Sequence, residues 1–364
     1  MKVSEFVKKL GIRIDKDFDY DLDIIDKKVK FINENRDRAE YNGCEEIIRE
    51  QNALIDLDYI KASEFIEGIT LEEIEDFDID ESTKVLHAFP NFIESLPKDY
   101  DKKIEFLKNL KRDTQNTSLV ILKKANNTPE KFKTLVCKKP SHLSALEEAL
   151  KQARIDRDVM YKQGYMPDVS KKFIEFINAR FFENNTNLMY IQNEKGEKIK
   201  RPGYGSYRGL VFINGNTIPV PNVNVAGASW KPFPSTQVES EMDSLLRMYN
   251  ESSVHPVLDA IVFKTRFIRI HPFSDANGRT SRILLNYMLV RNKYPTITIA
   301  GKEKYVYLNA MQNAITDNNY TEIIKLVLIL LNERCDKYIS FMEEIREQNK
   351  KKLEYIIELE DEKE

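Results

Sequence analysis

Residue types that could carry out a reaction converge between positions 266 and 290, where the chain reads RFIRIHPFSDANGRTSRILLNYMLV. We expect an apolar helix to end at His271, because Pro272 disfavours the helical conformation of the residue before it. A histidine held at such an end is a candidate general base. Phe273 is apolar and is expected to bury and pin the loop, while Asp275 adds a carboxylate.

The residues that follow this carboxylate predict a site for an anion. Ala276, Asn277 and Gly278 are small or tolerate left-handed backbone conformations, so their N–H groups can point together into a nest. A new helix begins near Arg279 and adds the positive end of its dipole. Arg282 projects from the same side of that first turn. A base, a carboxylate, a nest and two arginines together suit a polyphosphate bound with Mg²⁺.

These residues resemble the signature of the Fic (Fido) family of protein nucleotidyltransferases, written HPFx[D/E]GNGRxxR. The chain matches it from His271 to Arg279 and again at Arg282, except that Ala276 replaces the first glycine. The resemblance extends over about residues 142–333. It implies a mainly α fold, a Fic-type helical bundle with a short β-hairpin flap next to the active site, together with an N-terminal helical region.

Two flanking segments are also similar to the family. SYRGLVFINGNTIPVP resembles the flap hairpin, and its Asn-Gly pair predicts a two-residue turn. The resemblance implies that a target protein docks there as an added strand. The flap residues would be Leu210, Val211, Phe212, Ile213 and Ile218. PTITIAGKEKYVYLNAMQNA resembles the segment that lines the nucleotide base, so Tyr305 and Asn313 are expected near the adenine.

An upstream segment suggests regulation. Glu67 lies in the last turn of a helix predicted at residues 41–67, where a carboxylate opposes the helix dipole. Ser63, Glu67 and Gly68 match the pattern [S/T]xxxE[G/N] of family members that carry a built-in inhibitor. The resemblance implies that Glu67 pairs with Arg282, the arginine expected to hold the γ-phosphate, and so lowers transfer. It also implies a second role, in which Glu67 positions water for the removal of AMP.

The resemblance thus implies a protein AMP-transferase with Mg²⁺ as cofactor and ATP as co-substrate. Asp275 would hold the Mg²⁺, and the nest with Arg279 would cradle the phosphates. His271 would take the proton from a Ser, Thr or Tyr hydroxyl of the target protein. The hydroxyl oxygen would attack the α-phosphorus and pyrophosphate would leave. Asn277 would fix either the α-phosphate or the loop.

Two alternatives stay open at this point. The first is a Fic-fold enzyme with another donor, transferring UMP, GMP, phosphocholine or phosphate. Alanine at position 276 is also found in phosphate-transferring Doc-type toxins, although these lack the Gly-Arg that follows here and the second arginine. The second alternative is a non-catalytic module that binds a partner protein. The intact His271 argues against it, because a scaffold has no need of a base.

Composition limits the class of protein further. The chain has 364 residues, of which 41% are hydrophobic and 32% charged, which is enough apolar content for a folded core. There are 56 basic and 59 acidic residues, and the net charge of −3 argues against a nucleic-acid binder. Three scattered cysteines favour a reducing compartment, so we expect a cytoplasmic protein.

No membrane partner is expected, because the longest apolar run is shorter than the roughly 20 residues of a membrane span. The first residues hold no long apolar run, so no signal peptide is expected. The sequence leaves the oligomeric state open, including a homodimer. The expected regions are an N-terminal part at 1–140 with the inhibitory helix at about 55–68 and an accessory insertion at about 85–140, a catalytic domain at 142–333, and a charged helix at 334–364.

Overall fold

The computed structural model divides the chain into two units. One joins residues 1–29 to 144–334, and the other joins residues 30–143 to 335–364. Residues 1–29 thus belong to the same unit as the segment that carries the histidine motif. The structure describes residues 7–8, 10–36, 38–43, 59, 62–63, 66, 84–86, 119–121, 141–183, 190–192, 198–213, 216–219, 223–225, 228–299 and 303–361.

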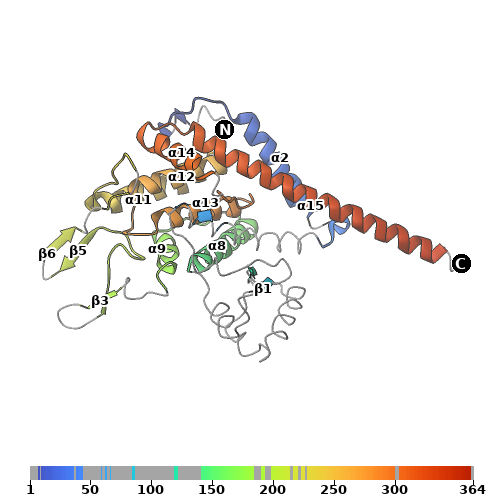
Figure 1. The fold of residues 1–364 in the computed structure, drawn as a ribbon, viewed down its shortest axis with the longest axis horizontal. Helices are drawn as coiled ribbons and strands as arrows, with labels where there is room; N and C mark the ends of the chain where they lie inside the picture. Colours follow the sequence, from blue (N-terminus) through green and yellow to red (C-terminus); the bar gives the residue numbers. More distant parts are fainter. Residues whose placement is uncertain are drawn as a thin grey trace. The chain divides into compact units, whose positions relative to one another are not determined.

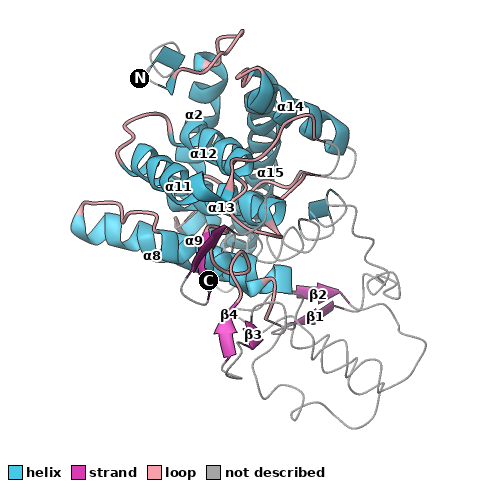
Figure 2. Cartoon of the chain, turned by 90° about the vertical axis from the view of Figure 1, so that its left-hand side faces the viewer, coloured by secondary structure: helices cyan, strands magenta, loops and turns pink. Residues whose placement is uncertain are grey.

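The first unit is a helical bundle with α12 (Pro256–Ile270) and α13 (Asn277–Arg291) side by side at its centre (Figure 1; Figure 2). Most side chains of these two helices are buried, 11 of 15 in α12 and 12 of 15 in α13, as expected for helices at the centre of a bundle. Other helices surround the pair: α9 (Lys171–Arg180), α11 (Ser235–Asn250) and α14 (Lys304–Thr316), with most of α8 (Ser141–Gln163), the first part of α2 (Asp19–Asn35) and the first part of α15 (Thr321–Asp361).

Local sequence signals account for where these helices begin and end. Ser170 caps α9 by accepting a hydrogen bond from the Phe173 N–H at 3.2 Å. Pro256 occupies the first turn of α12, where its missing N–H costs nothing. The same helix ends at His271, directly before Pro272, as the sequence predicts.

The described strands form three antiparallel pairs. β5 (Leu210–Ile213) pairs with β6 (Asn216–Pro219), so that Val211 lies opposite Ile218. β3 (Tyr190–Gln192) pairs with β4 (Lys198–Lys200), and in the second unit β1 (Lys84–Leu86) pairs with β2 (Leu119–Ile121). The turn residues 214–215 lie outside the described residues, and the role of the β5–β6 hairpin as a docking flap stays a prediction.

The second unit includes the C-terminal part of α15. The sequence suggests an apolar helix near 320–333 and a separate charged helix after it, whereas the structure shows one helix without interruption from Thr321 to Asp361. Residues 38–43 contact it through Asn349, whose side-chain nitrogen donates to the Glu40 and Asn42 carbonyls at 3.1 and 3.0 Å. No helix among the described residues is long and apolar enough to span a membrane.

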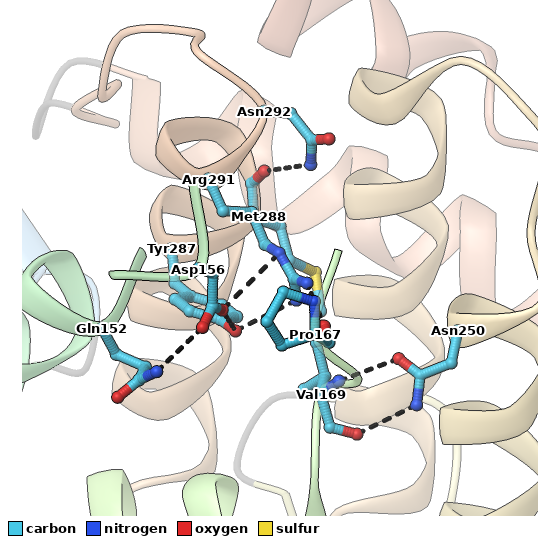
Figure 3. Close-up of polar contacts among 9 residues, drawn as sticks. All are labelled: Gln152, Asp156, Pro167, Val169, Asn250, Tyr287, Met288, Arg291 and Asn292. Carbon is cyan, nitrogen blue, oxygen red and sulfur yellow. Dashed lines mark hydrogen bonds and ion pairs between the residues drawn. The ribbon is translucent and has the colours of Figure 1, made fainter. Parts of the chain in front are cut away.

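A buried polar network connects α8 to α13 inside the first unit (Figure 3). The Tyr287 hydroxyl donates to Asp156, and Arg291 donates to that same hydroxyl at 3.0 Å. Arg291 also lies 3.8 Å from the Asp156 carboxylate and donates to the Pro167 carbonyl. All three charged or hydroxyl side chains are at most 3% exposed. Burial raises the pKa of Tyr287, so its hydroxyl stays protonated as a donor.

The network predicts a large effect of removing its arginine. Arg291→Met leaves the buried Asp156 carboxylate without its counter-ion, and we expect the free energy of unfolding to fall by about 3 kcal/mol. Urea unfolding of the purified chain would measure this. The control is Lys27→Met, which removes an exposed ion pair with Asp23 and should change the free energy by less than about 0.5 kcal/mol. Equal effects of the two substitutions would contradict the prediction.

Candidate active site

His271 stands at the junction of α12 and the loop that follows. Its backbone is left-handed, with φ 55° and ψ 60°, and its N–H still donates to the Phe267 carbonyl at 2.9 Å. Its Nδ1 lies 3.2 Å from the Ile268 carbonyl oxygen. Because a carbonyl only accepts, Nδ1 carries the hydrogen, and in the neutral ring Nε2 has the lone pair that can take a proton. The ring also meets the edge of Trp230, with centroids 6.3 Å apart.

Asn277 holds the loop closed. Its side-chain oxygen accepts from the Phe273 N–H at 2.9 Å, and its side-chain nitrogen donates to the Phe273 carbonyl at 2.8 Å. The Asn277 side chain is 2% exposed and Phe273 is fully buried, with its ring against Tyr207 and Phe267. Of the two roles expected for the Asn277 side chain, these contacts favour fixing the loop.

Asp275 points outward from this loop. Its side chain is 53% exposed, and one oxygen, Oδ1, accepts from the Ala276 N–H at 2.5 Å and from Arg279 at 3.3 Å. The carboxylate therefore has a fixed orientation and access to solvent. These properties suit Mg²⁺, which typically binds through one or two carboxylates, substrate phosphates and water. No cluster of three acidic, histidine or cysteine ligands occurs among the residues that the structure describes.

Ala276 adopts the conformation for which the family signature uses glycine. It has φ 60° and ψ 18°, and it precedes the first turn of α13 without a side-chain cap. A left-handed alanine costs roughly 1–2 kcal/mol relative to a right-handed one. The N–H groups of the first turn, including those of Asn277 and Gly278, have no partner inside the helix and form a ready anion site.

Residues 203–208, of which 206–208 begin the segment that resembles the flap hairpin, brace the loop from outside, a role that sequence reasoning did not assign to them. The Gly203 carbonyl accepts from the Ser274 N–H at 2.8 Å, and the Arg208 N–H donates to the Pro272 carbonyl at 2.7 Å. Gly203 has φ +86°, and a Cβ on it would lie 2.0 Å from the Ser274 Oγ. Glycine is therefore required at this position both by the backbone conformation and by the close approach.

The side chain of Arg208 donates hydrogen bonds to the carbonyl groups at the C-terminal end of α12. The guanidinium is fully buried and donates to the carbonyl oxygens of His271 at 2.6 Å, Ile270 at 3.0 Å and Phe233 at 2.5 Å. The last carbonyls of a helix lack intrahelical partners, and a cation there also meets the negative end of the dipole. Burial lowers the pKa of Arg208 to about 10, so the side chain stays charged at neutral pH.

Asn178 of α9 connects residues 203–208 to the loop that follows His271. Its side-chain nitrogen donates to the Asp275 carbonyl at 3.2 Å and to the Thr280 hydroxyl at 3.1 Å, and its oxygen accepts from the Gly205 N–H at 2.9 Å. It is fully buried. An asparagine on the apolar face of an amphipathic helix, two residues before its end, is the one sequence signal that could have identified it.

The other predicted residues are placed as follows. Arg282 is 3% exposed in α13 and hydrogen-bonds to the buried Tyr307 of α14. Tyr305 is 76% exposed and Asn313 is exposed on the same helix, so their adenine-binding role stays a prediction. Of the inhibitory residues, Ser63 is a buried helical residue, whereas Glu67 and Gly68 lie outside the described residues. The flap residues belong to β5 and, for Ile218, to β6.

The fold is similar to that of solved Fic-domain structures. Residues 171–289 match the sequence model of the Fic/DOC family, a range that runs from α9 almost to the end of α13. The chain is 37% identical over 83 residues to a probable protein adenylyltransferase of Aquifex aeolicus, which is 22% of this chain and 26% of that protein. It is 30% identical over 100 residues to the protein adenylyltransferase Fic of Culex quinquefasciatus, which is 28% of this chain and 20% of that protein.

Solved structures support the fold. A Fic domain containing signaling protein from Bacteroides thetaiotaomicron matches with a TM-score of 0.50 at 16% identity, over 89% of this chain and 98% of that one. Fic-1 from C. elegans matches with a TM-score of 0.50 at 15% identity, over 93% of this chain and 73% of that one. The matches to the curated relatives span only about a quarter of their length, so activity is inferred below from the site itself.

The close approach at Gly203 predicts a defect that is specific to the site. Gly203→Ala must push Ser274 away, while Gly164→Ala, at φ +77°, meets nothing within 4 Å. Both variants should lose about 1 kcal/mol of stability to backbone strain, and Gly203→Ala should lose roughly 1–3 kcal/mol more. Thermal unfolding of the two variants would measure the difference. Equal losses in the pair would show that residues 203–208 do not brace the loop.

Proposed function

We propose that the chain transfers AMP from Mg-ATP to a Ser, Thr or Tyr hydroxyl of a target protein. The observation that carries this proposal is the state of His271. Its Nδ1–H is used on the Ile268 carbonyl, so Nε2 is the basic atom, at the start of a loop that leads into a helix N-terminus. A base beside an anion site is what attack of a hydroxyl on a phosphorus atom requires.

Each remaining residue of the motif has a role in this reaction. The N–H groups at the start of α13 and the Arg279 side chain would bind the α- and β-phosphates, and Arg282 the γ-phosphate. The Nε2 atom of His271 would remove the hydroxyl proton, the oxygen would bond to the α-phosphorus, and the bond to the leaving pyrophosphate would break. Asn277 would act on none of these atoms, and would keep the loop in shape.

Asp275 is the residue that would hold Mg²⁺. The ion would neutralise charge on the phosphates and on the leaving pyrophosphate. Oδ1 of Asp275 is tied to Ala276 and Arg279, so the carboxylate would be oriented before the ion arrives.

Glu67 is proposed to regulate the site. Support comes from the match of Ser63, Glu67 and Gly68 to the inhibitory pattern. A carboxylate engaged with Arg282 would displace the γ-phosphate and lower transfer. Removal of AMP by water, with Glu67 positioning that water, is a second reaction that the same residue would permit. The target would add a strand to the β5–β6 hairpin, an arrangement in which backbone contacts dominate recognition.

Phosphate transfer is the second candidate function, and Ala276 is the observation that favours it, because Doc-type toxins that transfer phosphate share this alanine. The two reactions differ in which phosphorus atom lies near His271. Arg279 and Arg282, each partly or fully buried beside the helix start, favour a donor held by its β- and γ-phosphates.

The proposal predicts labelling with α-labelled ATP that depends on His271 and is restrained by Glu67. The chain is incubated with Mg²⁺ and cell lysate as wild type, Glu67→Gly, and Glu67→Gly with His271→Ala. We expect Glu67→Gly to raise incorporation about tenfold or more, because it removes a charge-assisted contact to Arg282. Loss of His271 should abolish incorporation.

Two controls sharpen this experiment. Glu64→Gly, three residues before Glu67 and at a variable position of the inhibitory pattern, should label like the wild type. A parallel reaction with γ-labelled ATP should leave the target unlabelled. If the target is labelled by γ-labelled ATP and not by α-labelled ATP, the chain transfers phosphate and not AMP. If neither nucleotide labels the target, the proposed function is refuted.

A further inference from the structure

Three polar side chains from three helices meet inside the first unit, away from the loop itself. They are Lys264 of α12, Arg282 of α13 and Tyr307 of α14, and they are 1%, 3% and 3% exposed. The Lys264 ammonium donates to the Tyr307 hydroxyl at 2.7 Å and lies 4.4 Å from the centroid of its ring. Arg282 also donates to this hydroxyl. One tyrosine oxygen therefore accepts hydrogen bonds from two buried cations.

Two acceptors of the buried Lys264 carry no charge. They are the Tyr307 hydroxyl and the Met311 sulfur, the latter at 3.0 Å. A tyrosine oxygen has two lone pairs and can serve both donors. Burial by itself raises the pKa of Tyr307, but the charges of Lys264 and Arg282 and their hydrogen bonds outweigh it, and the pKa is lowered.

We propose that Tyr307, held in place by Lys264, is a positioning residue that fixes the guanidinium of Arg282 for the terminal phosphate of the bound nucleotide. The inference rests on the proposed function and deepens it. A free arginine side chain has about 2 kcal/mol of rotamer entropy to lose when it binds an anion. An arginine already hydrogen-bonded to a buried partner has lost much of that freedom before the ligand arrives.

The geometry of a guanidinium allows Arg282 to bond to Tyr307 and to bind a phosphate at the same time. A guanidinium has five donors in a rigid plane, so a bond to Tyr307 leaves donors that can bind a phosphate. An acceptor that is a neutral hydroxyl orients the arginine without cancelling its charge, as a carboxylate would. Lys264 adds a second positive charge behind the tyrosine, and its own position is fixed by α12, the helix that ends at His271.

The test compares, by calorimetry, how tightly ATP and AMP bind to variants of the full chain that all carry Glu67→Gly, so that the proposed contact of Glu67 with Arg282 does not compete with the phosphate. Because Arg282 is expected to contact only the terminal phosphate, Tyr307→Phe should weaken ATP binding about tenfold, the loss typical of a hydrogen bond to a charged group, and leave AMP binding within about twofold. Tyr287→Phe is the matched control. It removes a buried tyrosine hydroxyl from α13 outside the site, and should lower stability without changing the ratio of the two affinities.

A double-mutant cycle separates positioning from a structural role. In an Arg282→Ala background, Tyr307→Phe should have no further effect on the ratio of ATP to AMP affinity, because the tyrosine acts through the arginine. If Tyr307→Phe unfolds the chain by removing the hydroxyl to which Lys264 donates, Lys264→Met with Tyr307→Phe removes both partners and should fold while keeping the loss of ATP affinity. The inference would be overturned if Tyr307→Phe, alone or with Lys264→Met, left the ratio of ATP to AMP affinity unchanged while Arg282 is present.

Two further outcomes keep the inference distinct from the proposed function. ATP binding that depends on Tyr307 without any AMP transfer would refute only the proposed function. A crystal structure of Tyr307→Phe without nucleotide gives a readout independent of binding: we expect the Arg282 side chain to move, and an unmoved guanidinium would overturn the inference. Failure of the Glu67→Gly chain to bind ATP would overturn both.

Discussion

The active site depends on the hydrogen bonds that the last carbonyl groups of α12 accept. His271 leaves the helix in a left-handed conformation, which exposes the last carbonyls of a buried helix where water cannot reach them. The buried guanidinium of Arg208 donates to two of these carbonyls, at Ile270 and His271, and its backbone N–H donates to Pro272. Without this contact, the position of the proposed base would not be defined.

The rest of the site is a closed set of hydrogen bonds around this end. Asn277 closes the loop on Phe273, and Asn178 ties the Asp275 carbonyl to α9 and to Gly205. Every contact uses a fully or nearly fully buried side chain, and buried polar groups of this kind impose one geometry because an unmade bond is expensive. The loop therefore has its shape before a nucleotide binds, which is the condition for stabilising charge that develops on phosphate oxygens.

Much of this could be predicted from the sequence. The break at Pro272, the helix that follows the loop, and the burial of Phe273 follow from local rules, and the structure has all three. Arg208, Asn178 and Lys264 could not be found in this way. They act over distances of 60 or more residues along the chain, or from helices whose faces meet only after folding, and no local pattern marks an arginine that caps a distant helix. The left-handed backbone of Ala276 could not be predicted from the local sequence either, because its surroundings set this conformation against the preference of alanine.

The central claim is that the preformed loop presents the α-phosphorus of ATP to His271. The most direct test is a crystal structure of the Glu67→Gly chain with Mg²⁺ and a non-hydrolysable ATP analogue. We expect the α- and β-phosphates on the α13 N-terminus and Arg279, the γ-phosphate on Arg282, the ion on Asp275, and the α-phosphorus on the side of His271 Nε2. A nucleotide bound in the opposite sense, with its γ-phosphorus nearest to His271, would contradict the account and identify a phosphate-transferring enzyme.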